Sequence, residues 1–292
     1  MADERVDPVT GQKTTGHEWN GIEELDTRIP RVVIFFLVAT TLFAIVYWIL
    51  LPAWPTGNSY TKGILGFDQH SVVMGEVGAA AAERAKWTDR IATESFDEIS
   101  RDPQLMTYVR ESGHAAFIDN CAACHGMNGT GGTGYPNLTA GAWLWGGDPE
   151  TIAETISLGI NSTQLDTRIS QMMAFGRDGI LTRDQVFEVA AYVRSLSGQK
   201  LNAEDKAMLG AGQKIFAENC VSCHGATGQG MPTVGAPDLT DQVWLYGGDA
   251  QSVYMTIYSG RQGHMPHWSD RLSPTEIKLL ALYVGTLAEP KS

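Results

Sequence analysis

The sequence predicts an all-α protein in which one membrane-spanning helix is followed by two small helical domains that repeat each other. Three observations lead to this fold class: a charge-free apolar run near the N-terminus, an internal duplication, and helix-start signals in both copies. We expect five segments: residues 1–31 before the membrane, an anchor at 32–51, a helical linker at 52–101, and domains at 102–198 and 199–292.

The apolar run Val32–Leu51 has 20 residues without a charge or a proline. At the rise of an α-helix it extends roughly 30 Å, which matches the hydrocarbon core of a bilayer. Tyr47 and Trp48 lie near its far end, as interfacial aromatic residues do. The alternative is a cleaved signal peptide, but a mainly polar stretch precedes the run and no clean cleavage site follows it. We therefore expect an uncleaved anchor.

Charges are placed asymmetrically around the anchor. Arg28 and Arg31 flank its start, whereas Lys62 is the only basic residue within a comparable stretch after it, so the positive-inside rule places the N-terminus in the cytoplasm. The whole chain has 21 Lys and Arg against 33 Asp and Glu, a formal net charge of −12. This charge disfavours nucleic acid as a partner and fits either a basic docking partner or simple solubility.

The two halves of the remaining chain repeat each other. "FIDNCAACHG" at 117–126 matches "FAENCVSCHG" at 216–225, and "PNLTAGAWLWGGD" at 136–148 matches "PDLTDQVWLYGGD" at 237–249. The first offset is 99 residues and the second is 101, so one loop has gained or lost two residues, as loops tolerate. The chain therefore contains an internal duplication.

Capping residues predict where the helices of each copy begin. Asp102 with Pro103 opens the first copy and Asn202 opens the second. We expect a turn at Gly113 before the helix that carries the first cysteine pair. Each copy closes on a helix with a capping box, Thr182 to Gln185 and Ser273 to Glu276. These closing helices carry apolar stripes: Val186, Val189, Ala190 and Val193 in one, and Ile277, Leu280, Ala281 and Val284 in the other.

The motif Cys-x-x-Cys-His occurs once in each copy and uses every cysteine of the chain: Cys121, Cys124 and His125, then Cys220, Cys223 and His224. On a helical turn, two such cysteines reach the vinyl groups of a haem and the histidine points at its iron, which is c-type haem attachment. A zinc site would need further ligands, and a thiol-redox site would need a βαβ context that is absent. We expect two covalently bound haem c groups, attached outside the cytoplasm as in bacteria.

The second axial ligand decides whether each iron is closed for electron transfer or open for substrate chemistry. In the second copy Met265 is the candidate, 41 residues after His224. In the first copy Met172 and Met173 are both candidates, 47 and 48 residues after His125. We expect each methionine to serve the iron of its own copy, with the neighbour's iron as the alternative.

Other residues near these sites have less specific roles. Met127 and Met231 follow their histidines too closely to be ligands, and Met255 is expected in the core. His264 and His267 are expected to flank the ligand rather than to bind iron. A second set is expected to line the haem sites: the carbonyls of Pro136 and Pro237 as acceptors for the histidines, Trp143 and Trp244 as pocket walls or as indole N–H donors to propionates, and Arg261 near a propionate.

Three stretches together resemble a known family. "TTGHEWNGIEELDTRIPR" at 14–31, "SQMMAFG" at 170–176 and "GRQGHMPHW" at 260–268 are similar to diheme subunit III of cbb3-type cytochrome c oxidases, the CcoP or FixP family. The resemblance covers nearly the whole chain and implies two tandem class I cytochrome c domains. The family has Met-Pro at both axial positions. By that pattern Met172 takes the ligand's place, although Met173 stands where the family has proline.

The resemblance also implies a function and a location. Such a subunit lies in the bacterial inner membrane and passes electrons from a donor cytochrome c towards a monoheme cytochrome c subunit and the catalytic subunit, without reducing oxygen itself. Two alternatives remain: a diheme peroxidase and the electron-transfer subunit of a periplasmic dehydrogenase. Methionine ligands at both irons disfavour the peroxidase, and the N-terminal stretch and anchor disfavour the dehydrogenase.

Overall fold

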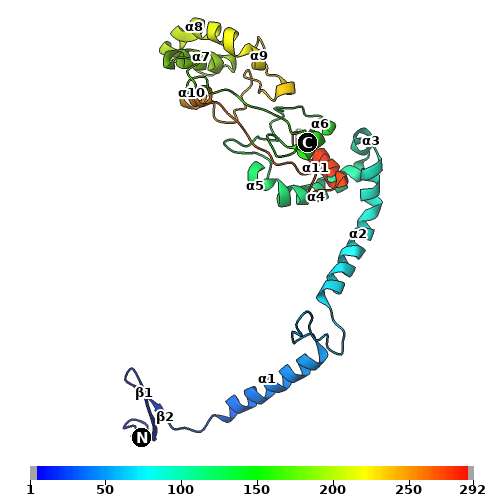
Figure 1. Cartoon of the computed structure of the whole chain (residues 1–292), viewed down its shortest axis with the longest axis vertical. Helices are drawn as coiled ribbons and strands as arrows, with labels where there is room; N and C mark the ends of the chain where they lie inside the picture. The colour runs from blue at the N-terminus through cyan, green and yellow to red at the C-terminus, as the bar shows by residue number, and fades with distance from the viewer. Residues whose placement is uncertain (1–4, 289–292) are drawn as a thin grey trace. The chain divides into compact units, whose positions relative to one another are not determined.

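The computed structural model describes residues 5–288, and the chain forms two compact units, residues 1–83 and 84–292 (Figure 1). The first four residues of the predicted segment 1–31 and the last four of 199–292 lie outside the described residues. Apart from one short hairpin, the regular structure within the described part is helical. The predicted all-α fold class is therefore confirmed.

A β-hairpin lies in the first unit, before the anchor. Strands β1 (Thr14–Trp19) and β2 (Ile22–Leu25) pair in antiparallel fashion. They are joined by Asn20 and Gly21, whose φ angles are +48° and +85°. Positive φ at both turn residues is the geometry that an Asn-Gly hairpin turn requires. The sequence analysis did not anticipate this hairpin, although Asn-Gly is the local signal for one.

Helix α1 (Arg31–Leu50) is the one helix in the described part of the chain that is long and apolar enough to cross a membrane. Its mean hydropathy is 2.6 and none of it is buried by the rest of the protein. The hydroxyl groups of Thr40 and Thr41 donate to carbonyl oxygens one turn earlier in the helix, at Phe36 and Leu37. The helix thus satisfies its own polar groups, as a membrane span must.

The end of α1 is closed by the loop that follows it. The backbone N–H groups of Ile64 and Leu65 donate to the carbonyls of Ile49 and Leu50, at 2.9 and 3.1 Å. These carbonyls have no partner inside the helix. Gly63, with φ of +69°, allows the close approach, because a Cβ there would lie 2.4 Å from the Leu50 oxygen.

The predicted linker holds helices α2 (Gln69–Thr93) and α3 (Phe96–Arg101). The last turns of α2 belong to the second unit, where Ile91 is fully buried and Trp87 stacks on Tyr108. Arg90 forms ion pairs with Glu94, which directly follows α2, and with Asp102, which is the N-cap of the helix that begins at Pro103. The pair with Asp102 connects the end of α2 to the first copy of the repeat.

The second unit contains both copies of the repeat. The first copy holds α4 (Pro103–Asn120), α5 (Ala122–His125), α6 (Pro149–Leu158) and α7 (Arg183–Leu196). The second holds α8 (Ala203–Asn219), α9 (Val221–His224), the 3₁₀ turn η1 (Pro232–Val234), α10 (Ala250–Ser259) and α11 (Pro274–Leu287).

Most predicted helix starts are confirmed. Asp102 and Asn202 accept backbone N–H groups as N-caps, and both capping boxes are formed. The predicted turn at Gly113 is wrong, because α4 continues through this residue. The glycine serves packing instead: a Cβ at Gly113 would lie 2.6 Å from Cβ of Tyr283 in α11.

That contact reveals an exchange between the copies. Helix α11, which closes the second copy in sequence, packs on α4 and α6 of the first, as Figure 1 shows. Helix α7, which closes the first copy, packs on α8 and α10 of the second. The predicted apolar stripes of α7 and α11 are buried, but each lies in the other copy's core. The limits 102–198 and 199–292 thus delimit the two copies in sequence. In space, the hydrophobic core of each copy contains the closing helix of the other copy.

The two crossing segments run past each other as short antiparallel pairs. Ile160 and Met265 exchange two backbone hydrogen bonds of 2.9 Å, and Met172 and Arg261 exchange two of 2.8 and 3.1 Å. Gly159, which ends α6, lies so close that a Cβ there would sit 2.5 Å from the Met265 oxygen. A Cβ at the equivalent Gly260 would likewise lie 2.4 Å from the Met172 oxygen.

Candidate haem sites

Each Cys-x-x-Cys-His motif forms one tight helical turn. The long helix α4 ends at Asn120, Cys121 joins it to α5 with φ of −113°, and α5 carries the rest of the motif to His125. Gly126 stops this turn with φ of +76°. The second copy repeats the pattern through Cys220, with φ of −116°. Both cysteine pairs are thereby held on one turn beside their histidine.

The two histidines have the same fixed orientation. Nδ1 of His125 lies 3.1 Å from the carbonyl oxygen of Pro136, and Nδ1 of His224 lies 3.1 Å from that of Pro237. A carbonyl only accepts, so Nδ1 donates and Nε2 is left as the basic nitrogen. Burial lowers the pKa of both histidines, which keeps the rings neutral. The predicted role of the two proline carbonyls is confirmed, and the arrangement is that of a metal-ligating histidine with a fixed acceptor.

The first cysteine of each motif is unsuited to thiolate chemistry. Burial, with a smaller contribution from the neighbouring cysteine, raises the pKa of Cys121 and of Cys220 to about 11. Such thiols stay protonated at neutral pH, unlike the activated thiols of redox enzymes. Within residues 5–288, no three His, Cys, Asp or Glu side chains gather to hold a metal ion. The raised pKa values of Cys121 and Cys220 disfavour a thiol-redox site.

Each candidate methionine lies at the hydrophobic core of the other copy, as the closing helices do. Met265 packs against the core of α4, α6 and α11, where Cys121 also lies. Met172 packs against the core of α7, α8 and α10, together with Cys220. The packing is thus opposite to the local pairing expected from the sequence, because each crossing segment carries its methionine into the neighbour's core. Met173 is 55% exposed, whereas Met172 packs against the core, so the two adjacent methionines differ in their surroundings.

Both tryptophans expected to wall the sites lie at these cores, Trp143 at the first and Trp244 at the second. Nε1 of Trp244 is buried and has no hydrogen-bond partner among the described residues. An orphaned indole N–H costs free energy unless a ligand accepts from it. A haem propionate is such an acceptor, so the residues present fit a haem. Arg261 instead stacks on Tyr246 at 4.2 Å and donates to Thr256.

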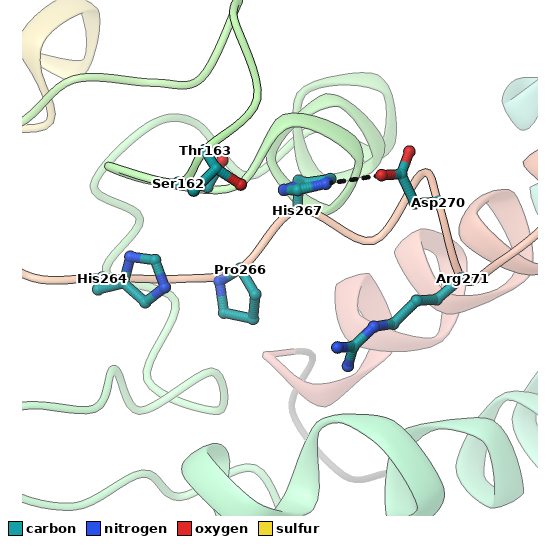
Figure 2. A pocket seen from close by; sticks show the side chains of 7 residues that line it. All are labelled: Ser162, Thr163, His264, Pro266, His267, Asp270 and Arg271. Carbon is teal, nitrogen blue, oxygen red and sulfur yellow. Dashed lines mark hydrogen bonds and ion pairs between the residues drawn. The ribbon is translucent and has the colours of Figure 1, made fainter.

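The chain around Met265 lines a cavity of about 330 Å³, shown in Figure 2. His264 and His267 both face it, and each commits a ring nitrogen to the protein. Nδ1 of His264 lies 2.9 Å from the Asn161 carbonyl, and Nε2 of His267 lies 3.1 Å from the Asp270 carboxylate. These contacts agree with the expected flanking role. The expected core position of Met255 is wrong, since this residue is 39% exposed.

The sequence analysis missed the contacts that join the two sites. The N–H of Gly134, two residues before the histidine's proline acceptor, donates to the Leu245 carbonyl of the other copy at 2.8 Å. Gly235, the equivalent glycine, lies against the ring of Trp145. Arg168 stacks on that ring at 5.0 Å. The repeat alignment shows that Gly134 corresponds to Gly235 and Trp145 to Tyr246. It does not show that each glycine packs against the aromatic ring of the other copy.

Comparisons with known proteins identify the family of the chain. Residues 11–58 match the family model "N-terminal domain of cytochrome oxidase-cbb3, FixP", residues 111–197 match "Cytochrome c", and residues 207–284 match "Cytochrome C oxidase, cbb3-type, subunit III". A cbb3-type cytochrome c oxidase subunit FixP of Bradyrhizobium sp. (strain ORS 278) is 47% identical over 100% of both chains. The chain belongs to the FixP/CcoP family of cbb3-type cytochrome c oxidase subunits.

Two further FixP/CcoP relatives show how evenly the similarity extends. The CcoP subunit of Azospirillum sp. (strain B510) is 43% identical over 100% of both chains, and that of Cereibacter sphaeroides is 43% identical over 94% of both. Because both cytochrome c models match, this FixP/CcoP chain is a haem c protein. The apolar helix α1 and the oxidase relatives together indicate that it is anchored in a membrane.

Proposed function

We propose that this chain is the membrane-anchored diheme cytochrome c that relays electrons to the catalytic subunits of a cbb3-type terminal oxidase. The observation that carries the proposal is the pairing of one histidine and one methionine at each core. His125 with Met265, and His224 with Met172, would close both axial positions of each iron. A site without an open position passes electrons rather than binding oxygen or peroxide.

The protein's contribution would be to hold two redox groups beside its two hydrophobic cores. Cys121, Cys124, His125 and Met265 would hold one haem, and Cys220, Cys223, His224 and Met172 the other. A bound haem c supplies a one-electron iron couple. The neutral histidine and the thioether would form the axial pair that raises the reduction potential of a c-type cytochrome.

The proposal includes a location and partners. With the N-terminus in the cytoplasm, α1 would hold residues 84–292 in the periplasm. A donor cytochrome c would dock there, and its basic docking face would suit the net charge of −12. The acceptors would be the monoheme cytochrome c subunit and the catalytic subunit. The chain on its own would reduce neither oxygen nor peroxide.

The haem stoichiometry is the first test. The purified chain should keep two haems after denaturing electrophoresis, because both are bound through thioether bonds. Cys121→Ser with Cys124→Ser should remove one, and Cys220→Ser with Cys223→Ser the other, as haem staining and intact mass would measure. A wild-type mass corresponding to a single haem would contradict the proposal.

The topology is tested by proteolysis. Protease added outside spheroplasts should digest the haem domains and spare residues before Arg31, because those would lie in the cytoplasm. Antibodies against an N-terminal tag would follow the protected fragment, with lysed cells as the control. A mature N-terminus beyond Leu51 would show that the anchor is cleaved.

The relay itself is tested with substrates and a deletion. The purified chain should be reduced and reoxidised by a cytochrome c without turning over peroxide, and its deletion should abolish cytochrome c oxidase activity in membranes. Rapid peroxide turnover would favour a diheme peroxidase. Intact oxidase activity with loss of a periplasmic dehydrogenase would favour a donor subunit of that enzyme.

A further inference from the structure

The N-terminal hairpin has no role in the haem sites, yet it is a defined structure. A third segment supports it: Val6 pairs with Lys13, and the N–H of Thr14 donates to the Arg5 carbonyl at 2.7 Å. Thr14 is only 2% exposed. A two-stranded hairpin alone is marginally stable in water, and the contacts of this third segment add to the stability of the hairpin.

The tip of the hairpin presents a large apolar pair to its surroundings. Trp19 and Ile22 lie directly opposite each other across the turn, and they are 66% and 72% exposed. Single exposed apolar residues are ordinary. A tryptophan and an isoleucine adjacent on one rigid tip form instead the kind of anchor that protein interfaces bury.

The hairpin also carries several negative charges, and their mutual repulsion destabilises it. Residues 14–26 hold Glu18, Glu23, Glu24 and Asp26 and no lysine or arginine, a net charge of −4 with histidine neutral. Glu18 and Glu23 are directly opposite on the two strands. Like charges in that relation destabilise a strand pair.

Two weak ion pairs approach this charge among the residues that the structure describes. Arg5 approaches Glu23 at 3.7 Å and His17 approaches Glu24 at 3.9 Å, both through exposed side chains, where such pairs are weak. Glu18 has no ion pair among the residues that the structure describes. The repulsion between Glu18 and Glu23 is therefore available to be relieved by an external cation.

The connection to the anchor limits what the hairpin can reach. Only residues 26–30 separate β2 from α1, so the base of the hairpin stays within roughly 20 Å of the start of the anchor. The family model that matches residues 11–58 spans hairpin and anchor together. An anionic cytoplasmic leaflet would repel the acidic hairpin. The cytoplasmic loops of a multi-span membrane protein are rich in lysine and arginine and would attract it.

We propose that the hairpin docks on a basic cytoplasmic loop of the oxidase subunit beside which α1 is anchored, with Trp19 and Ile22 buried and Glu18 and Glu23 paired to lysine or arginine. This inference rests on the proposed function and on the proposed orientation of the anchor. It assigns the N-terminal segment an assembly role that is separate from electron transfer.

Site-specific photo-cross-linking tests the docking in membranes that hold the whole oxidase. A benzoylphenylalanine residue in place of Trp19 should join to a lysine- and arginine-rich cytoplasmic loop of an integral oxidase subunit. The same group in place of Val9, which is 90% exposed but away from the tip, should give at least about fivefold less product. Equal yields, a lipid-only product or a product with an unrelated protein would overturn the inference.

Charge variants supply the second test and exclude simple unfolding. Glu18→Gln with Glu23→Gln removes the repulsion and should stabilise the hairpin, yet it should lower recovery of the oxidase with the tagged chain about three- to tenfold at low salt. Glu76→Gln with Glu83→Gln, two exposed acids on α2, makes the same change of charge elsewhere and should leave recovery unchanged. Unchanged recovery in the hairpin variant would overturn the inference.

The two proposals fail in different ways. If the wild-type chain did not recover any oxidase subunit, or if external protease removed the hairpin from spheroplasts, the proposed function or orientation would be at fault. If oxidase recovery and topology were as proposed and only the cross-link or the charge variants gave the contrary result, the hairpin docking alone would be wrong.

Discussion

Replacing Met265 with leucine should alter the haem bound at Cys121 and Cys124 and leave the haem at Cys220 and Cys223 nearly unchanged. The reason is the exchange of closing segments, which places Met265 in the core that contains Cys121. Loss of the thioether should convert that iron to high spin and lower its potential by on the order of 0.1 V, since axial ligands shift haem potentials over about 0.8 V.

Single-haem variants make this prediction decisive. In the Cys220→Ser and Cys223→Ser background, where the first haem remains, Met265→Leu should produce the high-spin spectrum and Met172→Leu should not. The opposite background should show the opposite dependence. Met173→Leu serves as the control and should be silent in both, because this side chain is exposed. A spectrum that changes with the methionine of the same copy would show that ligation is local.

Two alanine substitutions only two residues apart in α8 should change stability in opposite directions. At Gly212 a Cβ would lie 2.1 Å from the Glu188 carbonyl oxygen and 2.8 Å from Cβ of Tyr192, both in α7. Neither atom is the end of a flexible side chain, so the helices must separate. We expect Gly212→Ala to cost about 1–3 kcal/mol of unfolding free energy, as overpacking does.

The matched control is Gly210, where a Cβ would meet nothing within 4 Å. Gly210→Ala should stabilise the chain by about 0.5–1 kcal/mol, because alanine loses less backbone entropy in a helix. Urea unfolding of the full chain in detergent, followed by circular dichroism of the haem bands, would measure both. Destabilisation by both variants, or by neither, would argue against close packing of α7 on α8.

Local sequence signals predicted most of the fold, because the features concerned depend on neighbouring residues. Caps such as Asn202 act on N–H groups two or three residues away, and the haem turn needs only Cys121 to His125. The proline acceptors were also predictable, since Pro136 follows its histidine by only eleven residues. The turn wrongly expected at Gly113 shows the limit: a glycine required for packing has the same local signature as one required for a turn.

The exchange of α7 and α11 could not be predicted in the same way. Both closing helices have similar buried stripes, and each would satisfy either core by hydrophobicity alone. The choice is made by long-range contacts such as Ile160 with Met265 and Tyr283 with Gly113. Hydrophobic periodicity carries no information about such a contact, so the sequence analysis expected each methionine to pair within its own copy, which is opposite to the observed packing.

The exchanged helices also set an order for biosynthesis. With the N-terminus kept in the cytoplasm as proposed, the residues after α1 would cross the membrane in sequence order, so α7, α8 and α10 would all have emerged once residue 259 is outside. The core around Cys220 then has every helix it needs. The core around Cys121 must wait for Met265 and for α11, which ends at Leu287. A haem attached to the earlier cysteines would therefore be enclosed last, and a chain cut short after α10 would leave that haem, rather than the later one, without its proposed methionine ligand.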